Sequence, residues 1–117
     1  MLTASDLLSK SSHNVSQSLS EGDVQENLTQ IPKWQLVEGK LERSFHFKNY
    51  YQTMAFVNAI ACVAHAENHH PELIVNYNNC IVRFSTHSVN GISENDFICA
   101  AKIDAHIAVF LPRTLNH

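Results

Sequence analysis

Apolar and polar residues alternate in four short segments, which is the pattern of strands with one buried face. The segments Trp34–Val37 and Leu41–Phe47 flank Glu38-Gly39, and this arrangement predicts a hairpin. The segments Leu73–Tyr77 and Cys80–His87 flank an Asn-Asn pair that tolerates a tight turn, and they predict a second hairpin. The two-residue period places His87 on the more polar face of its strand, which favours a solvent-accessible pocket over the core.

Three segments have helical periodicity. Asp23–Gln30 predicts a short helix, and Tyr50–Asn68 predicts a long helix with apolar residues on more than one face. Ser93 followed three residues later by Asp96 resembles a capping box, so we assign Asp96 to the start of a helix rather than to catalysis. The order α-β-β-α-β-β-α predicts an α+β fold, a four-stranded antiparallel sheet with helices packed on one face.

The chain divides into a flexible N-terminal segment, residues 1–20, and a single domain, residues 21–117. The first 20 residues include seven serines and few large apolar residues after Leu8, so we expect them to be mobile and dispensable for catalysis. The helix expected over Phe97–Phe110 is apolar around more than half its circumference. One sheet cannot cover that much apolar surface, which predicts a homo-oligomer.

The most informative residues are the histidines near the end of the long helix and of the last strand. His69 and His70 precede Pro71, which disfavours helical geometry at His70 and makes the pair leave the helix sharply. His87 follows in the last strand. Because imidazole can both give and accept a proton near neutral pH, this cluster predicts proton-transfer chemistry.

A catalytic metal is the main alternative for the cluster. His65 and His69 are four residues apart and share one helical face, and His87 could complete a three-histidine site. The zinc-protease pattern His-Glu-x-x-His would place Glu at position 66, where the chain has Ala66. The three cysteines have no metal-binding spacing, so we predict no bound metal.

Composition excludes several other classes of protein. A net charge of −3 with eight Lys and Arg argues against direct nucleic-acid binding, and the three glycines form no phosphate-binding loop. The chain begins without a signal-peptide pattern, and its most apolar run, Met54–Ala66, is too short to cross a membrane. Three unpatterned cysteines suit a reducing compartment. We therefore expect a cytoplasmic protein without membrane contact.

The spacing of these residues resembles the signature of the pterin-4a-carbinolamine dehydratases. That signature runs through the following positions of this chain: His65, His69, His70, Pro71, Tyr77, His87 and Asp96. The resemblance also takes in Trp34, Gly39-Lys40-Leu41, Phe45-His46-Phe47, Ala55-Phe56-Val57, Tyr77-Asn78, Thr86-His87-Ser88 and Gly91-Ile92-Ser93. It covers about residues 21–117. His65 and Asn68 depart from it, because family members often have acidic residues there.

The resemblance implies a cofactor-free hydro-lyase. Its substrate would be 4a-hydroxytetrahydrobiopterin, which loses water to give a quinonoid dihydropterin in tetrahydrobiopterin recycling. The family's catalytic histidines correspond to His69, His70 and His87, with His69 and His87 as the expected proton-transfer pair. The residues that we expect to contact the substrate are His70, Thr86, Ser88, Glu67 and Pro71.

The resemblance also leaves alternatives open. It implies a homodimer or homotetramer and a pathway link to an aromatic amino-acid hydroxylase. Some family members act as dimerisation cofactors of a homeodomain transcription factor, so a non-catalytic binding module is a second hypothesis. A related pterin enzyme of molybdopterin metabolism is a third. Intact His69, His70 and His87 favour catalysis, because a scaffold has no chemical need of them.

Overall fold

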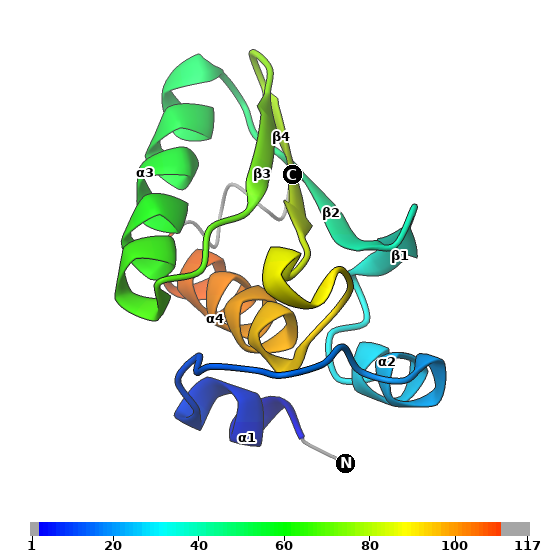
Figure 1. Ribbon diagram of the computed structural model, residues 1–117. Coiled ribbons are helices and arrows are strands. Elements are labelled where there is room, and N and C mark those ends of the chain that lie inside the picture. The colour runs from blue at the N-terminus through cyan, green and yellow to red at the C-terminus, as the bar shows by residue number, and fades with distance from the viewer. Residues whose placement is uncertain (1–2, 111–117) are drawn as a thin grey trace.

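A computed structural model describes residues 3–110 of the chain, with side chains through residue 107. The strands are β1 (Gln35–Val37), β2 (Lys40–His46), β3 (Glu72–Val75) and β4 (Asn79–Phe84). The helices are α1 (Ala4–Ser9), α2 (Glu21–Leu28), α3 (Tyr50–Glu67) and α4 (Glu94–Phe110), with a 3-10 turn, η1 (His87–Val89), before α4. The four strands form one antiparallel sheet in the order β1-β2-β4-β3 (Figure 1). The predicted α+β class is confirmed.

The inner face of the sheet forms the core together with α3 and α4. Leu41 pairs with Phe84 and Phe45 pairs with Cys80, and all four side chains are buried. The side chains that pack on them from the helices are Phe56 and Ile60 of α3 and Phe97, Ile98 and Ile103 of α4. Both hairpins and the long helix lie where the apolar pattern predicts them. Within the described residues, no helix has the length and apolar character needed to span a membrane.

The last strand is shorter than predicted. It ends at Phe84 rather than at His87, because the chain folds back on itself. The N–H of Thr86 donates to the carbonyl of Gly91 at 2.8 Å, and Asn90 between them adopts a left-handed φ of 51°. His87 therefore lies in η1, at the start of a closed loop, and not in the sheet.

The N-terminal segment, which we expect to be mobile, includes a helix and contacts the domain. Thr3 and Asp6 form a capping box at the start of α1, and Leu7 of this helix is fully buried. Residues 10–20, which we call the N-terminal strap, then cross the start of α4 (Figure 1). In the strap, the N–H of His13 donates to Asn95 at 3.0 Å, and that of Leu19 to the carbonyl of Ile92 at 2.8 Å.

This packing accounts for the apolar circumference of α4. The helix lies between the sheet, α3 and α1, so its apolar residues contact the rest of the same chain (Figure 1). Ile98, Ile103 and Ile107 are each at most 2% exposed. Among the described side chains, these apolar residues of α4 therefore need no second chain to cover them. Val109 and Phe110 lie outside the described side chains.

Candidate active site

The end of α3 sets the direction of the first candidate histidine. Asn68 takes a left-handed conformation, with φ 49° and ψ 44°, which asparagine adopts more readily than most residues. The N–H of His69 then bonds the carbonyl of Ala64 at 3.1 Å. This cap turns the chain away from the helix axis and sends the His69 side chain toward α4.

His69 lies against two different partners. Its Nε2 is 2.6 Å from Oδ1 of Asp96 on α4, and its ring stacks on Phe84 at 5.8 Å with 8° between the planes. The side chain of His69 is 13% exposed and that of Asp96 is fully buried. A carboxylate only accepts hydrogen bonds, so Nε2 carries the proton that Asp96 accepts, and Nδ1 is left for a ligand.

Asp96 joins His69 to the segment that carries His87. Its other oxygen, Oδ2, accepts from the Thr86 hydroxyl at 2.8 Å and from the Ser93 N–H at 2.9 Å. The bond to Ser93 is half of the predicted capping box, and the Ser93 hydroxyl accepts from the N–H of Asn95 at 3.2 Å. The helix-capping role of Asp96 is therefore confirmed. The sequence did not reveal that the same carboxylate also bonds an imidazole.

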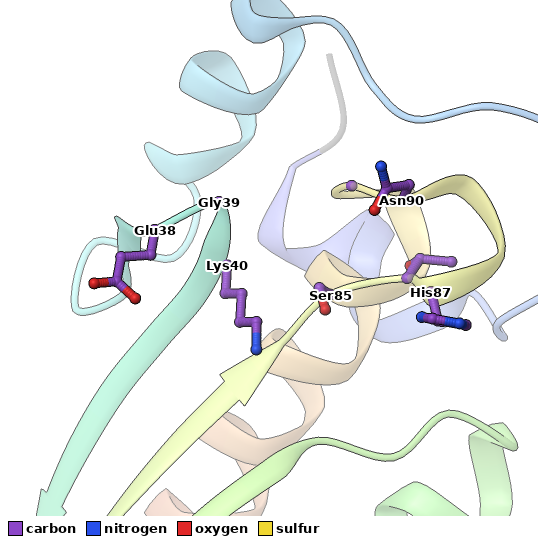
Figure 2. A pocket seen from close by; sticks show the side chains of 8 residues that line it. Glu38, Gly39, Lys40, Ser85, His87 and Asn90 are labelled. Atoms are coloured by element: carbon purple, nitrogen blue, oxygen red, sulfur yellow. The ribbon is translucent and has the colours of Figure 1, made fainter.

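His87, the residue after Thr86, borders a polar cavity of about 340 Å³. The cavity lies between the β1–β2 turn and the loop around η1, and Ser85, Thr86, Asn90 and Gly91 also line it. Figure 2 shows the His87 ring pointing out from the loop, with Ser85 beside it at the end of β4. Of these residues, only Thr86 and His87 are expected at the site from the sequence. The two-residue strand period, which groups Ser85 with His87, was the available signal.

The remaining sequence-predicted residues divide into two groups. His70 and Ser88 are exposed and Pro71 is partly exposed, and all three adjoin residues of the site in the chain. Glu67 lies elsewhere: its carboxylate accepts from Lys102 at 2.7 Å and from the N–H of Ser12 at 2.8 Å. In the structure Glu67 thus makes a structural contact with α4 and the strap, and its expected contact with substrate stays a prediction.

The electrostatics of Glu67 fit this structural role. Burial would raise the pKa of the Glu67 carboxyl, but the hydrogen bonds from Lys102 and Ser12 outweigh it, and the pKa is lower than the ordinary 4.5. His65 is exposed on α3. Among the described residues, no group of three or more His, Cys, Asp or Glu side chains is arranged to hold a metal ion.

The site can transfer protons in two places. His69 has a fixed orientation and one free ring nitrogen, and His87 is exposed beside a polar cavity. The bonds through Asp96 and Thr86 connect the two residues' segments, although 17 residues separate them in the chain. His87 lines the polar cavity and His69 does not, so the structure connects the two residues through Asp96 and Thr86 and not through a shared cavity.

Two known proteins have sequences closely similar to this chain. The chain is 58% identical over 109 residues to a protein of Bdellovibrio bacteriovorus named "Putative pterin-4-alpha-carbinolamine dehydratase", and the match covers 90% of this chain and 91% of that one. A protein of the same name from Stenotrophomonas maltophilia is 61% identical over 89 residues, covering 74% of this chain and 77% of the relative.

Solved structures are similar as well. The crystal structure of a transcriptional coactivator/pterin dehydratase from Brucella melitensis superposes with a TM-score of 0.73 at 35% identity, over 77% of this chain and 98% of that one. A pterin dehydratase-like protein identified as a RuBisCO assembly factor in the alpha-carboxysome shares the fold, with a TM-score of 0.52 at 24% identity over 62% of this chain and 84% of that one. The sequence model of the family described as pterin 4 alpha carbinolamine dehydratase matches residues 17–106. On this evidence the chain belongs to the pterin 4 alpha carbinolamine dehydratase family.

Proposed function

We propose that this protein dehydrates 4a-hydroxytetrahydrobiopterin by histidine acid-base catalysis. In this reaction the bond between C4a and its hydroxyl breaks, N5 loses its proton, and a C4a=N5 double bond forms as water leaves. The departing hydroxyl needs a proton donor and N5 needs a proton acceptor. His69 and His87 would supply the two functions, one as the acid and the other as the base.

The observation that carries the proposal is the bond between His69 and Asp96. A buried carboxylate at 2.6 Å from Nε2 fixes the ring of His69, and we assign its Nδ1 to proton transfer with the substrate. Dehydration requires no redox change, so these residues meet its needs with no cofactor in the proposed scheme.

The test is the rate of carbinolamine dehydration with purified protein, after subtraction of the uncatalysed rate. His69→Ala and His87→Ala should each lower kcat by about 10²- to 10⁴-fold. His70→Ala should mainly raise KM, because we assign His70 to holding the substrate. His46→Ala, an exposed histidine on β2, is the matched control and should leave both constants unchanged. A wild-type rate equal to the uncatalysed rate would refute the proposal and favour a binding module.

Further parts of the proposal rest on the family alone. We place the reaction in the recycling of tetrahydrobiopterin next to an aromatic amino-acid hydroxylase, and in a homodimer or homotetramer. Light scattering at micromolar concentration tests the assembly, and a single monomer mass would contradict it. Activity on a molybdopterin-related substrate, with none on 4a-hydroxytetrahydrobiopterin, would instead assign the enzyme to molybdopterin metabolism.

A further inference from the structure

The N-terminal strap contacts each of the three segments that carry the proposed catalytic network. Its first contact is with the end of α3. There the N–H of Ser12 donates to Oε1 of Glu67 at 2.8 Å, and the Ser12 hydroxyl donates to the carbonyl of Glu67. Glu67 is 9% exposed and also accepts from Lys102 of α4 at 2.7 Å. The strap is therefore bonded to α3 only two residues before His69.

The second contact of the strap is with the start of α4, which it crosses (Figure 1). The N–H of His13 donates to Oδ1 of Asn95 at 3.0 Å, and Nδ2 of Asn95 donates to the carbonyl of His13 at 2.6 Å. Asn95 is 6% exposed, and both polar atoms of its side chain are thus bonded to the backbone of one strap residue. Because Asn95 directly precedes Asp96 in the chain, this reciprocal pair also restrains Asp96.

The third contact is with the loop around η1. The N–H of Leu19 donates to the carbonyl of Ile92 at 2.8 Å. Next to this bond, Ser18 packs closely on Gly91, because a Cβ added at Gly91 would lie 3.0 Å from the Cβ of Ser18. The carbonyl of Gly91 accepts from the N–H of Thr86 at 2.8 Å, so the strap lies against the loop that Thr86 closes.

From these contacts we infer that the strap positions the catalytic network, with Asn95 and Glu67 as positioning residues. They bond the strap on one side and adjoin Asp96 and His69 in the chain on the other, so they act through the 2.6 Å bond between His69 and Asp96. That bond requires the end of α3 and the start of α4 to keep their separation. The effect on rate rests on the proposed function. The inference opposes the expectation, drawn from composition, that residues 1–20 are dispensable for catalysis.

Asn95→Ala tests the inference in the full chain, because it removes both bonds to His13. A small displacement of a catalytic group can lower the rate strongly, so kcat for dehydration should fall by about 10- to 100-fold. KM should change by less than about threefold, since the groups that bind substrate remain. Asn49→Ala is the matched control. It removes an asparagine that caps α3 by accepting from the N–H of Gln52 at 2.9 Å, and it should leave kcat unchanged.

NMR of protein labelled with nitrogen-15 at histidine gives a readout that does not depend on catalysis. The proton on Nε2 of His69 is shared with Asp96, and its exchange with water reports how often that bond opens. Exchange should be about 10-fold faster in Asn95→Ala than in wild type, and unchanged in Asn49→Ala. A general loss of stability would instead speed exchange in both variants.

A second variant tests the contact at the loop and serves if Asn95→Ala does not fold. Gly91 does not have a positive φ, so its backbone accepts alanine, but the new Cβ would press on Ser18. Gly91→Ala should therefore push the strap off the loop and speed exchange at His69. Adding Ser18→Gly removes the opposing Cβ and should restore slow exchange. Gly22→Ala, whose Cβ would project into open space, is the control and should have no effect.

The outcomes separate this inference from the proposed function. Wild-type exchange at His69 in both Asn95→Ala and Gly91→Ala would overturn the positioning role, even if dehydration is catalysed. Equally fast exchange in Asn95→Ala and Asn49→Ala would also overturn it, because the effect would then be one of stability. Faster exchange in Asn95→Ala alone, in a protein that does not dehydrate the carbinolamine, would leave the strap as the element that holds the network and refute only the catalytic proposal.

Discussion

Asp96 serves both the start of α4 and the candidate active site. One carboxylate oxygen accepts from His69, and the other accepts from Thr86 and from the N–H of Ser93. From the sequence, the spacing of Ser93 and Asp96 predicts the cap, because a cap is a local interaction. The bond to His69 depends on how α3 and α4 pack across 27 residues of chain, and no local pattern encodes that distance.

The same reasoning applies to the structural contacts of Glu67. In the sequence it stands two residues before His69, so proximity to the histidines suggested contact with substrate. In the structure Asn68 reverses the chain between them, and Glu67 and His69 have different neighbours. Asparagine at the end of a helix favours such a left-handed cap, so this residue was the available signal.

Asp96→Asn should show whether catalysis depends on the orientation of the His69 ring, because the ring itself remains in this variant. The amide can donate to Nε2 and so favour the wrong tautomer, and we expect kcat to fall by about 10²- to 10⁴-fold with a smaller change in KM. Nitrogen NMR of the His69 ring should report the change of tautomer. Ser20→Ala removes a comparable cap hydroxyl, at α2, and serves as the control for lost stability alone. An unchanged kcat in Asp96→Asn would remove Asp96 from the mechanism.

Glu67 and Lys102 should make the fold sensitive to acid. Because the pKa of Glu67 is lower in the folded than in the unfolded chain, its stabilisation is complete above the unfolded value, near 4.5, and is lost as the pH falls through the folded value. Lys102→Met leaves a nearly buried carboxylate without its cation and should reduce the free energy of unfolding at pH 7 by about 1–3 kcal/mol.

Urea titrations at pH 7 and pH 3 check this prediction. The loss in Lys102→Met should be largest at pH 7 and should shrink as the pH falls below the ordinary pKa of 4.5, because protonation then favours the unfolded chain of the wild type. Lys10→Met is the control and breaks the ion pair with Glu94, in which the side chains are 39% and 24% exposed. It should reduce the free energy of unfolding by no more than about 1 kcal/mol. An equal loss at the two pH values would show that Lys102 stabilises by packing instead.

At the scale of elements, the strands and long helices were predictable and the N-terminal segment was not. Both hairpins and α3 have strong apolar periodicity over their whole length, so local pattern suffices to find them. The helix α1 has only six residues, too few for a periodic signal. It is stable because Leu7 packs on α4, which is a tertiary contact. Its one local signal was the capping box of Thr3 and Asp6.

Leu7→Ala and Leu8→Ala compare the two faces of α1. Leu7 is fully buried, so its truncation should reduce the free energy of unfolding by about 2–5 kcal/mol. Leu8, on the same helix, is 43% exposed, so Leu8→Ala should reduce the free energy of unfolding by less than about 1 kcal/mol. Chemical denaturation measures both values. Equal small losses would mean that residues 1–20 are the mobile segment that their composition suggested. The kcat of folded Leu7→Ala should match wild type, because the proposed catalytic groups lie in residues 69–96.

At the scale of the whole molecule, one chain covers the helix α4 that the sequence suggested would need a partner. The sheet, α3 and α1 each bury part of it, and the strap crosses its start (Figure 1). Apolar periodicity reports how much of a helix is buried. It does not report whether the surface that buries the helix belongs to the same chain. Here α1 of the same chain packs on α4, and the apolar pattern did not predict this contact.

Thiol reactivity tests this packing. Burial raises the pKa of Cys80 to about 11 and, with the charges of Glu67 and Asp96, raises that of Cys99 to about 12. Both are fully buried, whereas Cys62 is exposed on α3. Folded protein at pH 8 should therefore react rapidly at Cys62 alone, since about one part in a thousand or less of the other thiols is ionised. Three thiols should react after unfolding. Rapid labelling of Cys99 in the folded protein would contradict the described position of α4.

The central claim is that His69 and His87 together transfer the protons of dehydration. The most direct measurement is the dehydration rate of the His69→Ala/His87→Ala double variant, compared with wild type and with the uncatalysed reaction, after circular dichroism has verified its fold. We predict a kcat at least about 10²-fold below that of wild type, because both the acid and the base are absent. A folded double variant that dehydrates the carbinolamine at the wild-type rate would contradict it.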